Sequence, residues 1–317
     1  MTSIVTLTVN PAIDYSAETD QVVPALEIRT RRERFDPGGG GINVARVVHA
    51  LGGRVRAIYA IGGLTGPVFE GLFARTGVPS RVVTIAGDTR IAHTVRELST
   101  GHEFRFTPEG PTLSLAECEA LFQAVVAEPG DWLVLSGSLA PGVPAEFYAR
   151  IIHAVRPRGT RVALDTSGAA LYHALEAGVD LVKPNKRELE HLLGRRAPTP
   201  AEEEALAREL AASGRAGIVA LSLGRRGAVL ASGNLLWRVA APEVPTASTI
   251  GAGDSFVGAM VLKLARGEPV EKAFLFGMAA GAAAAITPGT ELCRPADVEW
   301  LYGELLQRAG APSAGSA

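Results

Sequence analysis

An acidic residue, Asp254, stands directly behind two glycines at the start of an apolar segment. The run reads Gly251-Ala252-Gly253-Asp254, and the pattern that follows predicts a helix over residues 252–266. Glycines let the backbone turn sharply and expose N–H groups, and a helix N-terminus adds partial positive charge, so the run could bind an anion. The carboxylate has two interpretations: a group that performs chemistry, or a first-turn acid that stabilises the helix by up to about 1 kcal/mol.

A second glycine run precedes another predicted helix, over residues 42–51. It reads Pro37-Gly38-Gly39-Gly40-Gly41, with Asn43 on the first helical turn. One interpretation is a flexible loop. The other is a backbone that a polyhydroxylated or phosphorylated ligand can approach closely, at a helix N-terminus that favours anions.

A third run, Lys183-Pro184-Asn185-Lys186-Arg187-Glu188, leads from the end of a predicted strand into a helix. Proline near a helix start and an acid in the first turn are ordinary structural features. The functional interpretation assigns Lys183 and Asn185 to phosphate contacts and Glu188 to a magnesium ion, directly or through water. The sequence contains neither the Walker phosphate loop nor the dinucleotide-binding glycine fingerprint, so any nucleotide must be bound in another way.

Charge and composition exclude several classes of partner. The 317 residues include 31 Lys and Arg against 33 Asp and Glu, a net charge of −2, and no basic tract interleaved with aromatic residues, so we expect no nucleic-acid partner. A local group of arginines is either the solvated face of an edge strand or close to an anionic substrate. Its members are Arg29, Arg31, Arg32 and Arg34.

Cysteine content and hydropathy predict a cytoplasmic protein without a membrane segment. The two cysteines, Cys118 and Cys293, have no disulfide or zinc-ligand pattern. The first seven residues lack the features of a signal peptide and resemble a buried strand. The most apolar stretch, residues 273–286, is shorter than the roughly 18 residues of a membrane span and predicts a core helix.

Strand and helix patterns alternate along most of the chain, which predicts a single large α/β domain. Four helix–strand units in a row imply parallel strands joined by right-handed crossovers. Expected strands are 4–9, 55–61, 132–136, 161–165, 181–183 and 218–222, with a hairpin over 228–239 at one edge. Expected helices, besides the two above, are 115–127, 145–155, 169–177, 201–213 and 270–286. We expect the domain to span residues 1–310, followed by a disordered tail over 311–317.

Two segments fall outside this alternation and predict a small separate sheet, a lid. Residues 15–36 contain short apolar–polar alternations, and residues 88–107 contain two alternating stretches around the turn Ser99-Thr100-Gly101-His102.

Taken together, the three runs resemble the ribokinase-like, or PfkB, carbohydrate kinases. Residues 38–46 are similar to the N-terminal signature of that family and residues 249–256 to its C-terminal signature, within a resemblance that covers about residues 4–302. It implies a three-layer α/β/α fold with a mostly parallel central sheet and a β-sheet lid. Four further motifs resemble the branch that acts on phosphorylated ketohexoses: Asn10-Pro11-Ala12-Ile13-Asp14, Ser136-Gly137-Ser138-Leu139, Lys183-Pro184-Asn185 and Gly289-Thr290.

The resemblance implies that Asp254 is the catalytic base of an ATP-dependent kinase. The N–H groups of Gly251, Ala252 and Gly253 would stabilise the transferring phosphoryl group. An aspartate with the ordinary pKa of about 3.9 is ionised at neutral pH, and a helix N-terminus favours that state, so we expect a weak base that mainly orients the sugar hydroxyl.

The resemblance also implies the remaining site residues. The sugar-phosphate positions are Asp14, Gly38, Gly39, Asn43, Arg90 and Ser138. The ATP positions are Lys183, Asn185, Ser222, Gly224, Gly227 and Thr249. Glu188 would bind Mg²⁺, and a monovalent cation such as K⁺ would lie among Ser248, Ile250, Ala284 and Gly289. A homodimer that forms through the lid is implied as well.

The expected substrate is fructose 6-phosphate, phosphorylated at its 1-hydroxyl. Relatives that act on fructose 1-phosphate tend to carry Gly-Lys-Gly in the first glycine run, where this chain has four glycines. Fructose 1-phosphate and tagatose 6-phosphate stay open as alternatives, because 6-phosphofructokinase relatives can carry a basic lid residue where this chain has Glu27. A sugar-phosphate-binding regulator without turnover is the alternative of another class, since fold and function are separable.

Overall fold

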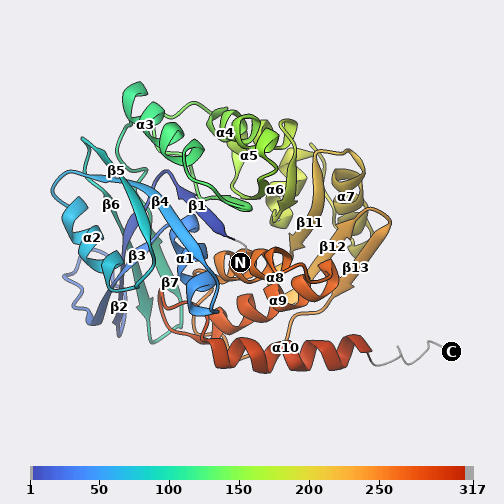
Figure 1. Ribbon diagram of the computed structural model, residues 1–317. Coiled ribbons are helices and arrows are strands. Elements are labelled where there is room, and N and C mark those ends of the chain that lie inside the picture. Colours follow the sequence, from blue (N-terminus) through green and yellow to red (C-terminus); the bar gives the residue numbers. More distant parts are fainter. Residues whose placement is uncertain (1–2, 311–317) are drawn as a thin grey trace.

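The computed structural model describes residues 3–310, and a nine-stranded sheet runs through the middle of the molecule (Figure 1). The strand order is β13-β12-β11-β10-β9-β8-β1-β4-β5, with parallel pairing from β5 to β11 and antiparallel pairing at β12 and β13. The strands are β1 (Ile4–Thr8), β4 (Val55–Gly62), β5 (Ser80–Ile85), β8 (Trp132–Ser136), β9 (Arg161–Asp165), β10 (Val179–Val182), β11 (Ala216–Ser222), β12 (Ala228–Ser232) and β13 (Leu235–Val239). The predicted tail, 311–317, lies outside the described residues.

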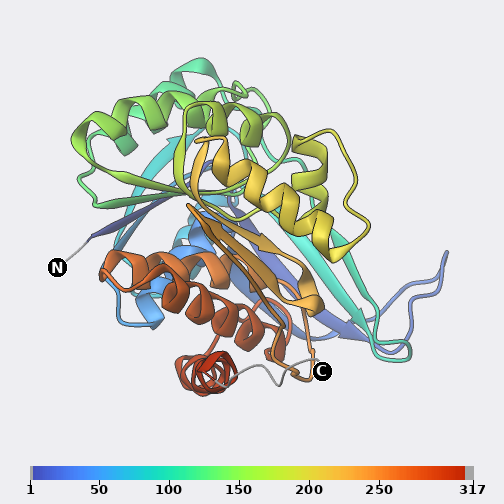
Figure 2. The same ribbon diagram turned by 90° about the vertical axis from the view of Figure 1, so that its right-hand side faces the viewer.

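Two layers of helices enclose this sheet (Figure 2). One hydrophobic core lies beneath α1 (Gly40–Ala50), α2 (Gly66–Ala74), α8 (Ala252–Ala265), α9 (Val270–Ile286) and α10 (Pro295–Gly310). The other lies beneath α3 (Leu115–Val126), α4 (Phe147–Val155), α5 (Gly168–Glu176), α6 (Lys186–Leu192) and α7 (Pro200–Ala212). Because successive side chains of a strand point to opposite faces, Ile4 joins the first core, whereas Val5 and Leu7 join the second. The three-layer α/β/α prediction is confirmed.

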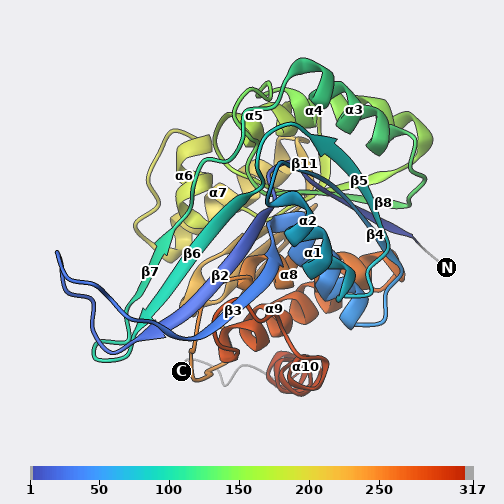
Figure 3. The same ribbon diagram turned by 90° about the vertical axis from the view of Figure 1, so that its left-hand side faces the viewer.

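A four-stranded lid projects from one side of the body (Figure 3). Its order is β3-β2-β6-β7, formed by β2 (Ala12–Thr19), β3 (Arg31–Gly38), β6 (Arg90–Glu97) and β7 (Glu103–Phe106). The first lid strand begins at Ala12, earlier than residue 15, because the chain continues from β1 into β2 after a short turn. The lid therefore starts directly at the carboxyl edge of the main sheet, where α/β proteins bind ligands.

Most predicted elements are present within a few residues of their expected bounds, but α2, β5 and α10 were not predicted. Helix α10 covers the outside of the first core with Val298, Leu301 and Leu305, while Trp300 is 55% exposed. These apolar residues have helical spacing, so the signal was present. The helix ends at Gly310, the last residue of the domain that we predicted.

The apolar stretch before residue 286 is the core helix that we predicted. Small residues let α9 approach α8 closely: a Cβ atom on Gly277 would lie 2.9 Å from the carbonyl oxygen of Phe256. Within residues 3–310, no helix has the length and apolar character needed to cross a membrane.

The arginines before residue 35 are paired with acids along the lid edge. Arg31 lies 2.5 Å from Asp20, and Arg32 lies 3.0 Å from Glu18. Because β3 is an edge strand and both arginines are exposed, these pairs favour the solvated-face interpretation over a role at the substrate.

Candidate active site

Asp254 lies on the first turn of α8, directly behind Gly251. Gly251 has a φ of 73°, a left-handed conformation that glycine adopts readily, and it allows the chain to turn into the helix. The side-chain amide of Asn43, on the first turn of α1, donates a 2.9 Å hydrogen bond to Oδ2 of Asp254. The starts of two helices from distant parts of the sequence therefore meet at one carboxylate.

Burial changes the acid–base properties of this carboxylate. Desolvation raises the pKa of Asp254 to about 6, and the negative charge of Asp165 adds to the effect, whereas the hydrogen bond from Asn43 and the charge of Lys183 lower the pKa. The expected pKa of about 3.9 was therefore wrong, because it took account of the helix N-terminus but not of desolvation. Asp254 is a stronger base than we predicted, with a pKa near the pH at which it would act.

A cavity of about 290 Å³ opens in front of Asp254, between the lid and the carboxyl ends of the strands. Nine predicted site residues line it: Asp14, Gly39, Asn43, Arg90, Ser138, Glu188, Ile250, Gly251 and Asp254. Six polar residues that were not predicted as site residues line it as well: Arg105, Thr107, Ser136, Asp165, Thr166 and Ser167. Charged and hydroxyl groups dominate the lining, as a polar, anionic ligand requires.

Asp14 is the lid carboxylate of this cavity, at the start of β2, and is only 7% exposed. Burial raises the pKa of Asp14 to about 6, against the opposing effect of positive charge on Arg105, Arg46 and Arg90. A Cβ atom on Gly38 would lie 2.0 Å from a carboxylate oxygen of Asp14. Gly38 does not line this cavity, and its contribution is the space that it leaves for the side chain of Asp14.

The middle of the same glycine run packs the start of α1 against the main sheet. A Cβ atom on Gly40 would lie 2.3 Å from the hydroxyl oxygen of Ser136, and one on Gly41 would lie 2.5 Å from the carbonyl oxygen of Leu7. The run is therefore neither a flexible loop nor only a ligand-binding backbone. It brings Asn43 to the sheet edge, where Asp254 is.

Two lid arginines differ in their availability to a ligand. The guanidinium of Arg90 donates to the backbone carbonyls of Asn10, at 2.7 Å, and Pro108, at 2.9 Å. Arg105 is exposed and has no hydrogen-bond or ion-pair partner among the described residues. Its position on β7, alternating with Phe104 and Phe106 in the predicted lid hairpin, is the signal that could have identified it.

A second cavity, of about 490 Å³, lies on the other side of the α8 N-terminus. Seven predicted residues line it: Lys183, Ser222, Gly224, Gly227, Thr249, Ala252 and Gly253. Its apolar wall includes Val244, Phe256 and Met278, which suit a flat, weakly polar group. Gly251 and Asp254 line the first cavity while Ala252 and Gly253 line the second, so one helix turn separates the two sites.

A buried ion pair lies beside that turn. Nζ of Lys183 lies 3.2 Å from Oδ1 of Asp165, and a Cβ atom on Gly253 would lie 3.3 Å from the same Nζ. Asp165 is the last residue of β9, at the carboxyl edge of the sheet where α/β proteins bind ligands, and this position is the signal that could have identified it.

The residues expected to bind metals give a mixed result. Glu188 accepts a hydrogen bond from the backbone N–H of Asn185 at 2.8 Å in a capping box, so the structural interpretation of that motif is correct, and Glu188 also lines the first cavity. Asn185 itself lines neither cavity. Among residues 3–310, no three His, Cys, Asp or Glu side chains form a ready metal cluster.

The four residues expected at a monovalent-cation site lie near the start of α8 and the end of α9. Ser248 is buried, and its hydroxyl accepts a hydrogen bond from the N–H of Ile250 at 3.2 Å. The carbonyl of Ala284 accepts hydrogen bonds from both the N–H and the hydroxyl of Thr287. Ser248, Ala284 and Gly289 line neither cavity.

Comparison with known proteins defines the class of this protein. A model of the pfkB family of carbohydrate kinases matches residues 3–297. The chain is 43% identical over 301 residues to the ATP-dependent 6-phosphofructokinase isozyme 2 of Mycobacterium tuberculosis, covering 94% of this chain and 88% of the relative. It is 41% identical over 307 residues to the Escherichia coli enzyme of the same name, covering 96% of this chain and 99% of the relative. The chain belongs to the pfkB family of carbohydrate kinases.

Further similar proteins include other phosphofructokinases. A crystal structure of phosphofructokinase-2 from E. coli with fructose 6-phosphate superposes with a TM-score of 0.91 at 39% identity, covering 96% of this chain and all of that one. The same enzyme with potassium gives 0.92 at 40% identity and the same coverage. A 1-phosphofructokinase from Rhodobacter capsulatus is 37% identical over 262 residues, 81% of this chain and 82% of the relative.

Proposed function

We propose that this chain transfers the γ-phosphoryl group of ATP to the 1-hydroxyl of fructose 6-phosphate, which yields fructose 1,6-bisphosphate and ADP. The observation that carries the proposal is the pair of cavities divided by the first turn of α8. A polar cavity faces Asp254, and a partly apolar cavity faces Ala252 and Gly253. Donor and acceptor bound in these cavities would meet at a glycine-rich helix N-terminus, where phosphoryl oxygens are stabilised.

Asp254 is the base in this reaction. Its carboxylate accepts the proton of the 1-hydroxyl while that oxygen attacks phosphorus, and the bond to the β-phosphate oxygen of ATP breaks as ADP leaves. Asn43 holds the carboxylate in place through the 2.9 Å hydrogen bond. The N–H groups of Gly251, Ala252 and Gly253 bind the equatorial oxygens, since they lie at the start of α8 with no partner inside the helix.

The sugar phosphate binds in the cavity under the lid. Asp14 and Asn43 offer a carboxylate and an amide for its hydroxyl groups. Arg105 is the principal phosphate ligand, because its guanidinium is uncommitted while Arg90 already donates to two carbonyls. Arg90 instead holds the lid against the loop after β1.

The oxygen ligands near the two cavities fit the metal ions that kinases of this kind use. Mg²⁺ prefers one or two carboxylates together with substrate phosphates, and Asp165 and Glu188 supply carboxylates at the cavity edge. When bound, the ion would neutralise phosphate charge. For a monovalent cation, the backbone carbonyls of Ser248, Ile250 and Gly289 would be the ligands, since the Ala284 carbonyl already accepts two hydrogen bonds.

A substrate panel tests the activity. MgATP is supplied with fructose 6-phosphate, fructose 1-phosphate or tagatose 6-phosphate, and kcat/KM is measured for each. We expect fructose 6-phosphate to give the largest value. If kcat/KM is larger for one of the other two sugars, that sugar is the substrate in place of fructose 6-phosphate. If all three sugars bind but none is phosphorylated, the protein is a sugar-phosphate-binding regulator and not a kinase.

We propose a homodimer that forms through the lid. Several large apolar side chains on the lid are exposed, including Ile28, Phe35, Leu98 and Phe106, and small sheets with exposed edges are poorly stable alone. E. coli phosphofructokinase-2 has been described in a tetrameric inhibited form, so a relative forms assemblies. Light scattering coupled to gel filtration measures the mass, and Phe106→Asp should convert a dimer to a monomer.

A further inference from the structure

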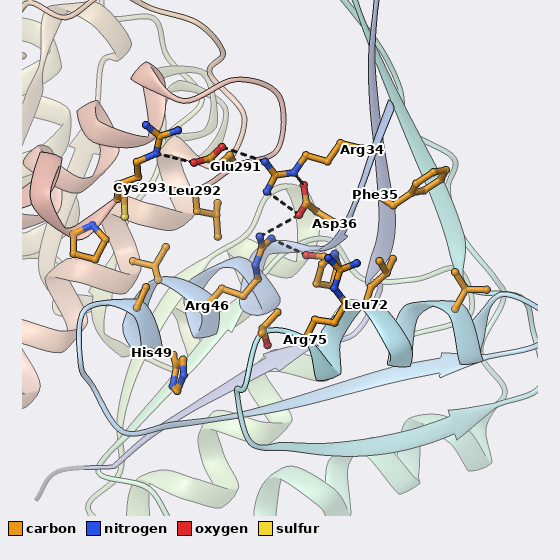
Figure 4. Close-up of a pocket in the computed structure, with 17 residues that line it drawn as sticks. Arg34, Phe35, Asp36, Arg46, His49, Leu72, Arg75, Glu291, Leu292 and Cys293 are labelled. Atoms are coloured by element: carbon orange, nitrogen blue, oxygen red, sulfur yellow. Dashed lines mark hydrogen bonds and ion pairs between the residues drawn. The ribbon is translucent and has the colours of Figure 1, made fainter. Parts of the chain in front are cut away.

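A third cavity, of about 840 Å³, lies outside the two described above. We call it the arginine groove, and it is formed between β3, α1, α2 and the loop before α10 (Figure 4). Four arginines line it, against two carboxylates, so its lining carries net positive charge. The arginines are Arg34, Arg46, Arg75 and Arg294, and the acids are Asp36 and Glu291.

We propose that the arginine groove binds a small organic phosphate with an apolar or aromatic body, and that its occupancy weakens binding of the sugar phosphate. The proposal concerns regulation of the site described under Proposed function and rests on that function. The chemistry of the ligand follows from charge complementarity and from the apolar part of the lining, and the coupling follows from the hydrogen bond between Arg46, which lines the groove, and Asn43, which lines the active-site cavity.

One arginine of the groove is available for an anion. Arg34 pairs with Asp36 and Glu291, and Arg294 pairs with Glu291. Arg75, at the end of α2, is exposed and has no acidic partner within 4.0 Å among the described residues. In Figure 4 its side chain extends toward the same wall of the groove as that of Arg46. A guanidinium in such a setting suits bidentate recognition of a phosphate.

The remaining wall is apolar. Val68, on α2, is 53% exposed, and Leu72 follows it one turn later on the same helix. Val47 on α1 and Leu292 in the loop before α10, both buried, line the groove as well. The groove volume lies within the range of about 300–1,000 Å³ that is usual for ligand sites. Inorganic phosphate alone would leave this apolar wall uncovered.

The wall nearest the active site consists of a buried carboxylate network. Asp36, only 7% exposed, accepts hydrogen bonds from Nε of Arg34 and from the hydroxyl of Thr290, both at 2.6 Å. Arg46 lies 3.6 Å from the same carboxylate and donates to Oδ1 of Asn43 at 3.3 Å. Because Asn43 in turn donates to Asp254, a ligand that draws Arg34 or Arg46 away from Asp36 would disturb the sugar-binding side.

The test uses isothermal titration of the full chain with 4-nitrophenyl phosphate, inorganic phosphate and 4-nitrophenol, which separate the charged group from the apolar body. We expect 4-nitrophenyl phosphate to bind more tightly than either part. Arg75→Gln should weaken its binding about tenfold, the loss of a charge-assisted contact. Val68→Glu should weaken it further by placing a negative charge in the groove. Arg208→Gln, an exposed arginine on α7 outside every cavity described here, is the matched control and should change nothing.

A second titration separates the groove from the active site. Saturating fructose 6-phosphate should weaken 4-nitrophenyl phosphate binding by a finite factor of about five, at the low end of allosteric coupling, and the reverse effect should have the same size. If both ligands competed for one site, the apparent Kd of 4-nitrophenyl phosphate would instead rise without limit as fructose 6-phosphate is added. The proposal would be overturned by such competition, by wild-type affinity in Arg75→Gln, or by the absence of saturable 4-nitrophenyl phosphate binding up to about 10 mM. Failure of fructose 6-phosphate itself to bind would contradict the proposed function and leave the first titration as the test of the groove.

Discussion

The side-chain amide of Asn43 holds the carboxylate of Asp254 at 2.9 Å, and this bond joins the first turns of α1 and α8. Each residue belongs to one of the two glycine-rich runs. The bond explains why both runs are needed: each glycine run brings one helix N-terminus to the same edge of the main sheet.

Removing the base should affect catalysis much more than binding. We expect Asp254→Asn to lower kcat about 10²- to 10⁴-fold and to leave KM for fructose 6-phosphate within a few-fold, because the amide keeps the shape and loses the proton acceptor. Asp297→Asn, which removes a first-turn acid from α10, is the matched control for helix capping and should keep full activity. Steady-state kinetics measures both parameters, and a near-wild-type kcat for Asp254→Asn would show that Asp254 is not the catalytic base.

The raised pKa of Asp254, about 6, predicts the acid side of the pH profile. The carboxylate accepts protons only when ionised, so kcat/KM should be level above about pH 7 and fall about tenfold per pH unit below the pKa. A substrate phosphate also titrates near pH 6. Asn43→Ala distinguishes the two, because loss of the hydrogen bond raises the pKa of Asp254 and moves the fall in rate to higher pH, whereas the substrate does not change. Exposed Asn234→Ala should leave the profile in place.

The buried carboxylate of Asp14 should reduce stability at neutral pH. Its folded pKa of about 6 lies above the ordinary 3.8, so the folded state binds the proton more tightly, and the free energy of unfolding falls as pH rises from about 4 to 6. Asp14→Asn should therefore be more stable than wild type at pH 8 by about 1–3 kcal/mol, with the gain shrinking toward pH 4. Thermal unfolding at several pH values measures this. A gain that does not depend on pH would contradict it, and Glu27→Gln on the exposed lid is the control.

Glu203, a fully buried residue of α7, should position the nucleotide loop. It accepts hydrogen bonds from Arg226 at 2.6 Å and from Arg238 at 3.1 Å, and Nζ of Lys186 lies 3.0 Å away. Burial alone would raise the pKa of Glu203, but these cations hold it at about 2. Arg226 belongs to the single turn over Gly224–Arg226, beside the second cavity.

We expect Glu203→Gln to raise KM for ATP several-fold while KM for fructose 6-phosphate stays constant, and to lower stability by about 3 kcal/mol, because three cations lose the negative charge that they share. Glu202→Gln, an exposed neighbour in the capping box of α7, is the control for local helix stability. Equal increases in both KM values would indicate a general structural role in place of loop positioning.

Much of this protein follows from local sequence patterns. The alternating strands and helices, the lid hairpin and the core helix α9 depend on the spacing of apolar and turn residues, which neighbours along the chain decide. For the same reason, Asp254, Asn43 and Asp14 could be named as candidate site residues: each stands at a helix start or just past a strand end, where backbone geometry favours ligands.

Other properties depend on distances through space, and only the tertiary structure decided them. The pKa of Asp254 is near 6 because folding removes water from the carboxylate and brings Asp165 close. Arg105 joins the cavity in front of Asp254 because β7 completes the lid, and the arginine groove exists only where β3, α1 and α2 meet. Desolvation and Coulomb interactions act between groups that are neighbours in space but distant in sequence, so no local pattern in the chain encodes them.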